Sequence, residues 1–515
     1  MASKPQTPAA EPVTSRDDRL VEFLIKHRWA TVVPIVLPLS KAYDTYWRLR
    51  HIYYRAWANA AHEHDQRVKK IQDAIQAWNR AGRPGKLCTS RKGWQTVSSR
   101  TSEYKRDAHT VDLDLHDILE INLERKTIKV EPRANMGQIS RELVRMGYTL
   151  PVVPELDDLT VGGLILGYGI ESTSHRYGLF SDTVLGAEMV LGDGRIVWCS
   201  PTEHADLFRA LPWSYGSLGF LTAVELPIVE CKPYVHITYE PVRTLDQACE
   251  RWAELVGPNG AGHVEGLMYS LHEGVLMWGE YADLPKGEKA NPIGKWHKPW
   301  FYKHAETALT RGQFSEYLPV RDWFHRHTRS LYWHGELLVP FGNEPWFRNT
   351  LGWLMPPKVS FMKLTQTESF KDYREKRNVV QDGLVPLRHM KACIEMFHRE
   401  FECYPLWLCP HLTPKHVPGG MVQPSTGEDE MYVDIGAWQV PGPVKRGEPW
   451  DGIQAVKNME AWLREHGSFQ CLYAVTEQDE DEFWTMFDPT LYRQVRKKYA
   501  AEGVFLDVYE KVRRR

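Results

Sequence analysis

The sequence lacks a paired-cysteine motif: it has 8 cysteines, and no Cys-x-x-Cys occurs among them. This absence argues against a disulfide framework and against a zinc site, so we expect reduced thiols, a protein that faces the cytosol, and no bound metal. The chain also has no excess of one charge, because 64 basic side chains balance 66 acidic ones. Nucleic acid is therefore not an expected partner.

Long apolar runs are missing too. The longest uncharged apolar stretch is 29–39, which contains two prolines, whereas a spanning helix needs about 20 residues. The stretch also lacks the small-residue cleavage site of a secretory signal. Its flanks are aromatic and basic, a mixture that suits a membrane interface. They include Lys26, Arg28, Trp29, Tyr43, Tyr46, Trp47, Arg48, Arg50, Tyr53, Tyr54, Arg55 and Trp57.

Residues 1–60 are therefore expected to form a disordered tail, 1–18, followed by a membrane-associating segment. Two alternatives remain for that segment. It folds onto the body of the protein, or it forms a short hairpin that spans the bilayer.

A P-loop is also absent, because no lysine follows the five glycines of the stretch 157–182. A Rossmann fingerprint is disfavoured, since Ser, Thr and His follow Gly167-Tyr168-Gly169 and favour a loop over a helix. Each ordered glycine costs about 0.5–1 kcal/mol relative to alanine. We interpret the repeated cost as a close approach of the main chain to a ligand.

The surroundings of these glycines indicate which ligand. Bare amide groups that face a concavity bind anions such as a diphosphate. Aliphatic side chains within the stretch are expected to line a flat apolar ring; they are Val161, Leu164, Ile165, Leu166 and Ile170. A diphosphate joined to a flat ring describes a flavin nucleotide.

At 515 residues the chain exceeds what one hydrophobic core usually organises. Residues 61–230 mix short strands with a few helices in an α+β pattern. Within them we predict a helix capped by Asp65 and ended by Gly82, two short strands about Lys92–Gly93, and a hairpin about Asp193–Gly194.

Residues 231–480 are expected to form a second domain, a cap made of an antiparallel sheet with helices on one face. Its strands include 263–281, 404–412, 431–438 and 469–478, and its helices include 386–401 and 452–467. Residues 481–515 are expected to form a helical segment that returns toward the first domain.

Six short motifs follow one another between residues 160 and 220: "TVGG", "GYG", "RYG", "LGDG", "DLF" and "LGF". Their order and spacing resemble the FAD-binding domain of the vanillyl-alcohol oxidase and para-cresol methylhydroxylase (PCMH-type) family over about residues 61–230. Further stretches are similar to the Δ24-sterol reductase branch of that family over nearly the whole chain. They are "RHTRS", "VPFGNEPWFR", "WLMPPK", "YPLWLCP" and "DEFWTMFDPTLY".

The resemblance implies a PCMH-type FAD domain of two subdomains with a cap over the flavin ring. It also implies NADPH as reductant, a sterol as substrate and an endoplasmic reticulum membrane with the catalytic part facing the cytosol. The implied cofactor-binding residues are Thr160, Val161, Gly162, Gly163, Leu164, Ile165, Leu166, Gly167, Tyr168, Gly169, Ile170, Glu171, Ser172, Ser174, Tyr177, Gly178 and Gly219.

A second FAD loop is implied at Thr89–Trp94, where the sequence departs from much of the family. The usual Gly-Gly-Gly-His-Ser is replaced by "TSRKGW". The histidine that often bonds the flavin covalently is absent, so the FAD is expected to be dissociable. Arg91 and Lys92 could pair with phosphate in place of the missing amides.

Saturating an unactivated side-chain double bond requires a proton at the less substituted carbon and then a hydride at the tertiary cation. The 20 tryptophans offer aromatic faces that stabilise such a cation. For the acid we predict Glu265, expected to stay protonated in an apolar pocket, and Tyr473. Strand alternation places His263 and Tyr269 on the face of Glu265.

The remaining polar candidates lie in or near "HRH". His325 and His327 are further acid candidates. Contacts with the NADPH phosphate or with lipid head groups are expected from basic residues, namely Arg321, Arg326, Arg329 and Lys358. Two other functions stay open: an FAD-dependent oxidase of a sugar, alditol or lactone, and a non-catalytic sterol-binding protein.

Overall fold

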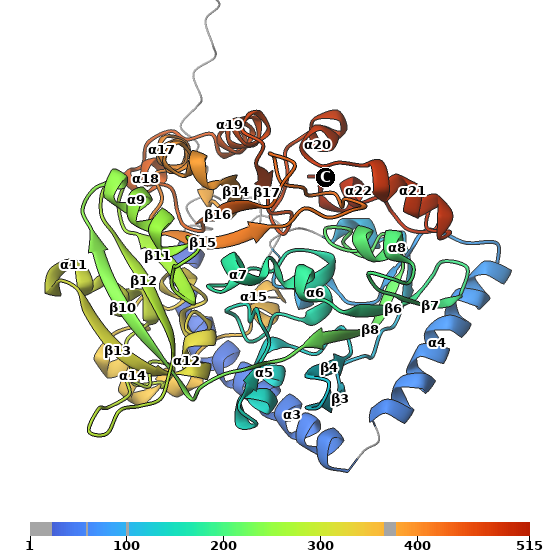
Figure 1. Ribbon diagram of the computed structural model, residues 1–515, viewed down its shortest axis with the longest axis horizontal. Helices are drawn as coiled ribbons and strands as arrows, with labels where there is room; N and C mark the ends of the chain where they lie inside the picture. Colours follow the sequence, from blue (N-terminus) through green and yellow to red (C-terminus); the bar gives the residue numbers. More distant parts are fainter. Residues whose placement is uncertain (1–22, 58–59, 99–101, 365–376, 515) are drawn as a thin grey trace, which may run out of the picture.

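The computed structural model describes residues 23–57, 60–98, 102–364 and 377–514. The tail expected at 1–18 lies outside the described residues. Two units built on separate sheets face each other, and a long N-terminal helix runs along the outside (Figure 1). The α+β class expected from the sequence is confirmed.

The first unit is built on a five-stranded antiparallel sheet in the order β3-β4-β8-β6-β7. The strands are β3 (Ile118–Asn122), β4 (Thr127–Val130), β6 (Gly186–Val190), β7 (Ile196–Cys199) and β8 (Phe220–Pro227). The predicted hairpin about Asp193–Gly194 joins β6 to β7, and Gly194 has the positive φ, 86°, that this turn requires.

A smaller part of the same unit pairs β1 (Leu87–Thr89) with β2 (His109–Val111) in parallel. The second strand expected after Lys92–Gly93 is wrong. A 3₁₀ turn, η2 (Gly93–Gln95), stands there instead, because the Gln95 side chain accepts a hydrogen bond from the Lys92 amide at 3.0 Å. Further 3₁₀ turns lie at η3 (Glu103–Lys105) and η4 (Phe180–Thr183).

The helices of this unit are α4 (Ala60–Arg80), α5 (Met136–Arg145), α6 (Val161–Leu166), α7 (Ser174–Tyr177) and α8 (Ala205–Ala210). Gly82 lies just beyond α4 with φ 81°, as predicted. The N-cap predicted at Asp65 is wrong, because α4 already contains the buried His64, whose Nδ1 lies 2.8 Å from Glu131. A tertiary contact thus extends the helix. The single turn of α7 stands where a loop was expected.

The cap is an eight-stranded antiparallel sheet in the order β13-β10-β12-β11-β15-β16-β14-β17. Its strands are β10 (Tyr234–Val242), β11 (His263–Met268), β12 (Gly274–Ala282), β13 (Phe314–Pro319), β14 (Gln381–Pro386), β15 (Leu406–Thr413), β16 (Glu430–Ala437) and β17 (Phe469–Gln470). The strand predicted over 469–478 is much shorter, since the chain leaves the sheet after Gln470.

The long helices α9 (Leu245–Leu255), α17 (Met390–Glu400) and α19 (Gly452–Glu465) cover one face of this sheet, as predicted (Figure 1). Trp252 of α9 packs on Gly266, and Phe397 of α17 packs on Gly383. The opposite face meets the first unit and shorter helices, α10 (Phe301–Glu306), α11 (Ala308–Arg311) and α12 (Val320–Phe324). Side chains on that inner face therefore lie between the two units.

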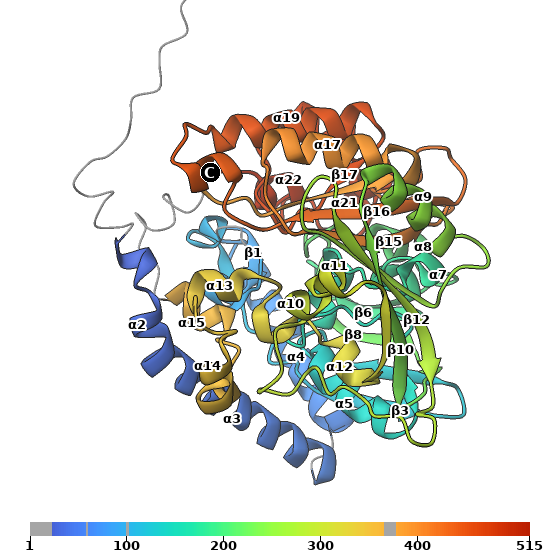
Figure 2. The ribbon, with the colours of Figure 1, turned by 90° about the vertical axis from the view of Figure 1, so that its left-hand side faces the viewer.

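The N-terminal segment comprises α2 (Trp29–Thr31), a π-helical stretch η1 (Val32–Val36) and α3 (Leu37–Ala56), and it runs along the outside of the molecule (Figure 2). Its inner side is buried at Val32, Val36 and Leu37. Ion pairs hold α3 at Arg50–Asp117, 2.6 Å, and Asp44–Lys358, 2.6 Å. The segment therefore folds onto the body along one side. None of the described helices combines the length and apolarity that a membrane crossing requires.

The C-terminal helices are α20 (Glu480–Met486), which contacts α19 of the cap, and α21 (Thr490–Lys498) and α22 (Val508–Val512), which contact the first unit. Arg496 of α21 donates to the carbonyl of Ser217 at 2.8 Å and to that of Phe505 at 2.9 Å. Leu87 in β1 pairs with Phe505. The remaining elements are β5 (Tyr148–Thr149), β9 (Val229–Glu230), α13 (His334–Leu338), α14 (Pro345–Thr350), α15 (Val359–Leu364), α18 (Gly442–Arg446), η5 (Thr328–Ser330), η6 (Gly352–Leu354) and η7 (Leu387–His389).

Candidate active site

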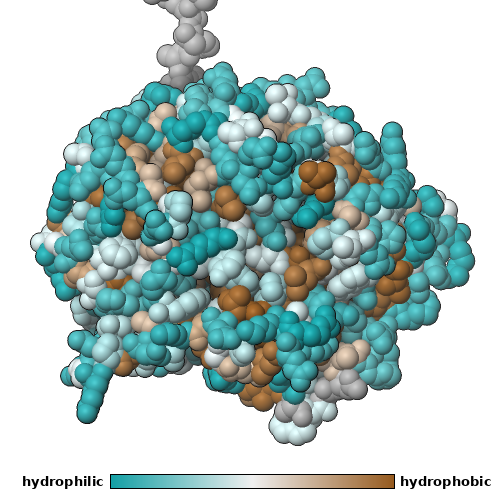
Figure 3. Space-filling model, viewed as in Figure 1, coloured by the Kyte–Doolittle hydropathy of each residue, from teal (hydrophilic) through white to brown (hydrophobic). Residues whose placement is uncertain are grey.

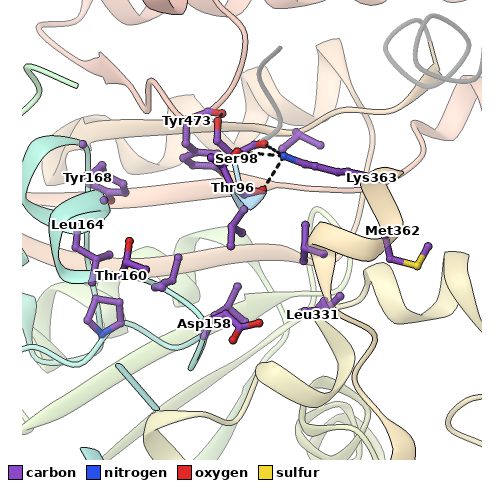
Figure 4. Close-up of a pocket in the computed structure, with 18 of the residues that line it drawn as sticks. Thr96, Ser98, Asp158, Thr160, Leu164, Tyr168, Leu331, Met362, Lys363 and Tyr473 are labelled. Atoms are coloured by element: carbon purple, nitrogen blue, oxygen red, sulfur yellow. Dashed lines mark hydrogen bonds between the residues drawn. The ribbon is translucent and has the colours of Figure 1, made fainter. Parts of the chain in front are cut away.

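A cavity of about 930 Å³ lies between the first unit and the inner face of the cap. That volume is near the upper end of the range of about 300–1,000 Å³ typical of ligand pockets, so it has room for a cofactor and a second ligand. Figure 4 shows Thr160, Leu164 and Tyr168 of the first unit on one side and Leu331 and Met362 of the cap on the other.

The glycine-rich stretch forms one wall of this cavity, although only part of it reaches the open space. Ten of the predicted cofactor-binding residues line the cavity: Thr160, Gly162, Gly163, Leu164, Leu166, Gly167, Tyr168, Gly169, Ile170 and Gly219. The other seven are not among the lining residues: Val161, Ile165, Glu171, Ser172, Ser174, Tyr177 and Gly178. A direct cofactor contact is therefore not supported for these seven.

The seven have other partners or positions. Val161 and Ile165 point into the hydrophobic core because they lie on the inner side of α6. Ser172 Oγ lies 3.1 Å from His263 Nδ1, and Ser174 Oγ accepts from the Glu171 amide. Gly178 ends α7 with φ 75°.

The glycines themselves have a different cause from the one expected. A Cβ at Gly162 would lie 2.8 Å from Pro132 Cβ, and one at Gly167 would lie 2.7 Å from the Gly163 carbonyl oxygen. A Cβ at Gly169 would meet Leu164 at 2.9 Å. At these three glycines the close approach is to neighbouring chain segments, so packing within the protein also requires them.

Basic side chains gather at the end of the cavity near β1. Arg91, Lys105, Arg133 and Lys511 line it, whereas the predicted Lys92 is exposed and does not. Burial, and then the nearby Arg133, lower the pKa of Arg91 to about 10. Within the described residues, Arg91 Nε is buried without a hydrogen-bond partner. An unpartnered buried guanidinium nitrogen in a cationic cluster fits a phosphate group.

Lys363 of α15 orders the loop that follows Arg91. Its Nζ donates to the carbonyls of Thr96, at 2.7 Å, and Ser98 (Figure 4). Ser98 Oγ in turn donates to the Tyr473 carbonyl at 2.7 Å. The loop is thereby held between the two units at the edge of the cavity.

The part of the cavity next to the cap sheet is aromatic. Its walls include Tyr168, Tyr332, Trp407, Trp438 and Tyr473. Tyr332 contacts Trp438 with ring centroids 4.2 Å apart, and Trp407 contacts Trp438 at 5.5 Å. Aromatic faces of this kind bind a large apolar ligand and stabilise positive charge on it.

Glu265, the first predicted acid, lies behind this aromatic wall and not in the cavity. Arg326 donates to its Oε2 at 2.6 Å, His327 lies 2.5 Å from Oε1, and Trp407 donates to Oε1 at 2.7 Å. Burial alone would raise the pKa of Glu265, but Arg326 and His327 lower it to about 2. The expectation of a protonated Glu265 is therefore wrong, because its partners Arg326 and His327 are distant in sequence.

Tyr473, the second predicted acid, lines the cavity. Its hydroxyl accepts a hydrogen bond from Trp438 Nε1 at 2.5 Å. Burial, and then the charge of Asp382, raise the pKa of Tyr473 well above its usual value. A phenol in this state is a weak acid, so Tyr473 is better suited to orient its neighbours than to release a proton.

The other predicted polar residues are engaged by the protein. His263 accepts from Trp323 Nε1 at 3.2 Å, and Tyr269 donates to the Tyr302 carbonyl. His325 Nε2 lies 2.7 Å from Ser140 Oγ, and burial lowers its pKa. None of these three lines the cavity.

The same holds for the predicted phosphate or lipid contacts. Arg321 donates to the Gly137 carbonyl, and Arg329 donates to main-chain carbonyls that include Lys295 and Lys298. Lys358 pairs with Asp44 and Asp158, and Arg326 pairs with Glu171 as well as Glu265. The structure thus gives each of these cations a structural partner.

Sequence reasoning missed three buried carboxyl groups. Asp382 and Glu155 line the cavity, and Asp434 lies beside Asp382. Burial, and then Glu171, raise the pKa of Glu155 to about 8. The signal for the aspartates was an acid inside an apolar strand pattern, "QDGLVP" and "YVDIGA".

The comparisons with known proteins agree with this geometry. A family model described as an FAD binding domain matches residues 66–200. A Delta(24)-sterol reductase of Arabidopsis thaliana is 46% identical over 98% of this chain and 94% of its own length. The chain belongs to the Δ24-sterol reductase family.

Two further Δ24-sterol reductases match over nearly the whole chain. One, of Homo sapiens, is 42% identical over 96% of this chain and 95% of its own length. The other, of Pisum sativum, is 43% identical over 96% and 92%. The family resemblance expected from the sequence is confirmed. The buried Arg91 Nε, which has no hydrogen-bond partner among the described residues, and the walls formed by Gly163 and Leu164 fit the FAD that this family's domain binds.

Proposed function

We propose that the chain is an FAD-dependent reductase that saturates the Δ24 side-chain double bond of a sterol, with NADPH as the hydrogen donor. Family membership over nearly the full length supports this proposal. The observation that carries it is the single cavity that joins a cationic end at Arg91 to an aromatic end at Trp407 and Trp438.

In this function, different residues of the cavity bind the cofactor and stabilise the reacting sterol. Arg91, Arg133 and Lys511 hold the phosphates of FAD, and the wall of α6 supports its ring. Bound and reduced, the flavin supplies a hydride. The aromatic side chains exclude water and stabilise the positive charge that protonation creates on the tertiary carbon, each by about 0.5–2 kcal/mol.

The alternative is an oxidase of a sugar, alditol or lactone. Such substrates need several polar groups that point into the cap side of the cavity. Here Tyr332, Trp407 and Trp438 offer aromatic faces on that side, and polar groups such as Asp382 and Tyr473 stand beside them. The sterol is therefore the better fit.

A spectroscopic experiment tests the proposal. The purified protein is expected to show a flavin absorption band that NADPH bleaches without oxygen and that a Δ24-unsaturated sterol restores. The saturated analogue of the same sterol, as control, leaves the flavin reduced. Restoration by oxygen alone, together with turnover of a polyol, would establish the oxidase.

We also propose that the outer face of α3 lies on the endoplasmic reticulum membrane, with the catalytic part in the cytosol. Figure 3 shows hydrophobic atoms on the lower part of one face, where α3 lies. Exposed apolar side chains on the N-terminal segment support this: Phe23, Leu24, Ile35, Leu39, Tyr46, Leu49, Ile52, Tyr53 and Trp57. Trp346 and Trp353 of the neighbouring α14 and η6 are exposed as well. A patch this extensive with aromatic residues is typical of a membrane interface.

The double substitution Leu49→Glu and Ile52→Glu tests the membrane proposal. Both side chains are about half exposed, 63% and 49%, so the folded state tolerates a charge there. The expected result is a loss of co-sedimentation with anionic phospholipid vesicles while the flavin spectrum is kept. Glutamate substitutions at the exposed Lys69 and Lys70 of α4 serve as the matched control. Unchanged vesicle binding by the double variant would refute the proposal.

A further inference from the structure

Two aspartates lie side by side on the inner face of the cap sheet. Asp382 in β14 pairs with Gly436 of β16, and Asp434 pairs with Leu384, so the two acids are diagonal neighbours on one face. A carboxylate oxygen of each and the sulfur of Cys471 all lie within 4.8 Å of one another. The exposed fractions of Asp382 and Asp434 are 1% and 0%.

This pair lacks the cationic partners that buried carboxylates normally need. In the described part of the chain, neither aspartate forms an ion pair with Lys, Arg or His. Burial, and then the charge of Asp434, raise the pKa of Asp382 well above its usual value, and burial raises the pKa of Asp434 to about 7. The pair therefore holds at least one proton at neutral pH, as two close carboxyls in an apolar site do.

The two acids differ in what they face. Asp382 lines the cavity, whereas a buried Oδ1 without a hydrogen-bond partner is common to both acids among the described residues. Asp434 does not line the cavity, and its Oδ2 accepts a hydrogen bond from the Tyr168 hydroxyl at 2.7 Å. Asp382 is thus the member of the pair that a bound substrate can reach. Asp434 is held by Tyr168 of the glycine-rich stretch.

We propose that Asp382 is the proton donor to the sterol side-chain double bond and that Asp434 positions and shares its proton. This assignment rests on the function proposed above. The O–H bond of Asp382 breaks, and the π electron pair forms a C–H bond at the less substituted carbon. The tertiary carbon, left positive, takes the hydride that the proposed reaction already supplies. Asp382, left as a carboxylate, recovers a proton from water through Asp434.

Other acids at the cavity fit this role less well. Tyr473 has a pKa raised well above that of an ordinary phenol, so it parts with its proton less readily than a carboxylic acid. Glu155 lies near Glu171 and Tyr332 at the first unit's side of the aromatic wall. Asp382 combines a place on the cavity wall with a buried carboxyl whose Oδ1 has no hydrogen-bond partner among the described residues.

The variant Asp382→Asn tests the assignment, because asparagine keeps the shape and removes the acid. The NADPH-driven bleaching of the bound flavin is expected to stay within about two-fold of that of the native protein. Its reoxidation by a Δ24-unsaturated sterol is expected to slow by about 10²–10⁴-fold, the usual contribution of a general acid. In D₂O the native protein is expected to place one deuterium on the less substituted carbon of the product.

Glu460→Gln is the matched control. Glu460 is a buried carboxyl whose pKa burial raises to about 7, and it lies outside the cavity. This variant is expected to keep the native rate of sterol-dependent reoxidation. Infrared difference spectra without sterol supply a readout that does not depend on activity. A protonated-carboxyl band that shifts in D₂O is expected to disappear in Asp382→Asn and to remain when Glu460 is replaced.

The native pH profile keeps the assignment testable if Asp382→Asn does not fold. The acid must be protonated, so the rate of sterol-dependent reoxidation is expected to fall as pH rises above neutrality through the pKa of the pair. The groups that face the pair and act on that pKa are Cys471, Tyr473, Tyr168 and Glu155. A flat profile would overturn the assignment.

Two failures are distinguishable. A native protein whose reduced flavin is not reoxidised by any Δ24-unsaturated sterol overturns the proposed function and this assignment with it. A native protein that reacts, beside an Asp382→Asn variant that reacts equally fast, overturns the assignment alone.

Discussion

At the scale of single residues, the environment and not the side chain decides what a carboxyl group does. Glu265 and Asp382 are both fully buried acids on the inner face of one sheet. Glu265 meets Arg326 and His327, so it is held ionised with a pKa of about 2. Asp382 meets a second acid, so it is held protonated. The same contrast makes the first a structural anion and the second a candidate acid.

At the cationic end of the cavity, Arg91 is one residue that is expected to contribute to FAD binding through its charge. Replacing Arg91 with Ala removes a charged group that faces the space for phosphate, which is worth about 1.5–3 kcal/mol. We expect FAD affinity to fall by roughly 10- to 100-fold, measured by the recovery of flavin fluorescence on dilution. Lys92→Ala is the control, because Lys92 is exposed and outside the cavity. Equal losses in the two variants would contradict the role given to Arg91.

The sequence could supply part of this residue-level description. Arg91 was predicted as a phosphate contact, because a basic residue replaced the family's glycines there, and it does line the cavity. Glu265 was correctly placed on an inner strand face by alternation. Its ionisation state was not predictable, because Arg326 and His327 approach it from the segment after α12, and no local pattern reports such a contact.

At the scale of elements, the glycine-rich stretch shows how backbone packing shapes the cofactor wall. The short helix α6 fits against Pro132 and its own following turn only because Gly162 and Gly167 lack side chains. The element is therefore under two constraints, one from the protein and one from the ligand. A count of glycines does not separate packing within the protein from contact with a ligand. The sequence therefore indicated the right segment, but it did not reveal that packing also requires the glycines.

Gly167→Ala separates the two constraints. The new Cβ would lie 2.7 Å from the Gly163 carbonyl oxygen and 3.2 Å from the Tyr215 ring, so the end of α6 must shift. We expect a loss of about 1–3 kcal/mol in the free energy of unfolding, measured by urea denaturation of the FAD-free protein. Gly163→Ala is the comparison, because its Cβ meets only Thr160 Oγ1, at 3.2 Å, and its loss of stability is expected to be smaller. A larger loss of stability in Gly163→Ala than in Gly167→Ala would show that packing is not the reason for a glycine at position 167.

Elements were predictable where a local signal existed. The helix end at Gly82 and the turn at Asp193–Gly194 both carry residues that adopt positive φ. The start of α4 was not predictable, because the contact of His64 with Glu131 extends it beyond its polar cap signal. The strand expected after Lys92–Gly93 failed because a side-chain cap from Gln95 turns the chain there.

At the scale of the whole molecule, Arg326 joins the two units. It donates to Glu171 of the first unit and to Glu265 of the cap, both at 2.6 Å, and the guanidinium is fully buried. The two carboxylates are compensated only while this cation stays between them. Arg326 is therefore a buried ionic contact between the two units, beside hydrogen bonds such as that of Tyr168 with Asp434.

Arg326→Met is expected to lower the free energy of unfolding by about 3–5 kcal/mol at neutral pH, because it removes the cation beside the buried carboxylates of Glu171 and Glu265. In the native protein the depressed pKa of Glu265 adds stability above about pH 4.5, and this contribution is lost as pH falls toward 2. In the variant the carboxyl is protonated more readily than in the unfolded chain. The deficit should therefore shrink as pH falls to about 5.

Arg329→Met is the control for that measurement. Arg329 is half-buried and donates to main-chain carbonyls, which do not titrate. Its stability deficit is expected to be the same at neutral pH and at about pH 5. If the loss of stability in Arg326→Met were equally independent of pH, it would contradict the inference that Arg326 stabilises the ionised Glu265.

The cavity draws its walls from nearly the full described chain, from Ile25 in the N-terminal segment to Lys511 in α22, with the cap strands in between. A nascent polypeptide therefore cannot close its flavin site while it is still being synthesised through the cap. Residue 511 must leave the ribosome first. FAD binding is therefore expected to follow the synthesis of the whole chain, although the glycine-rich stretch itself is made early.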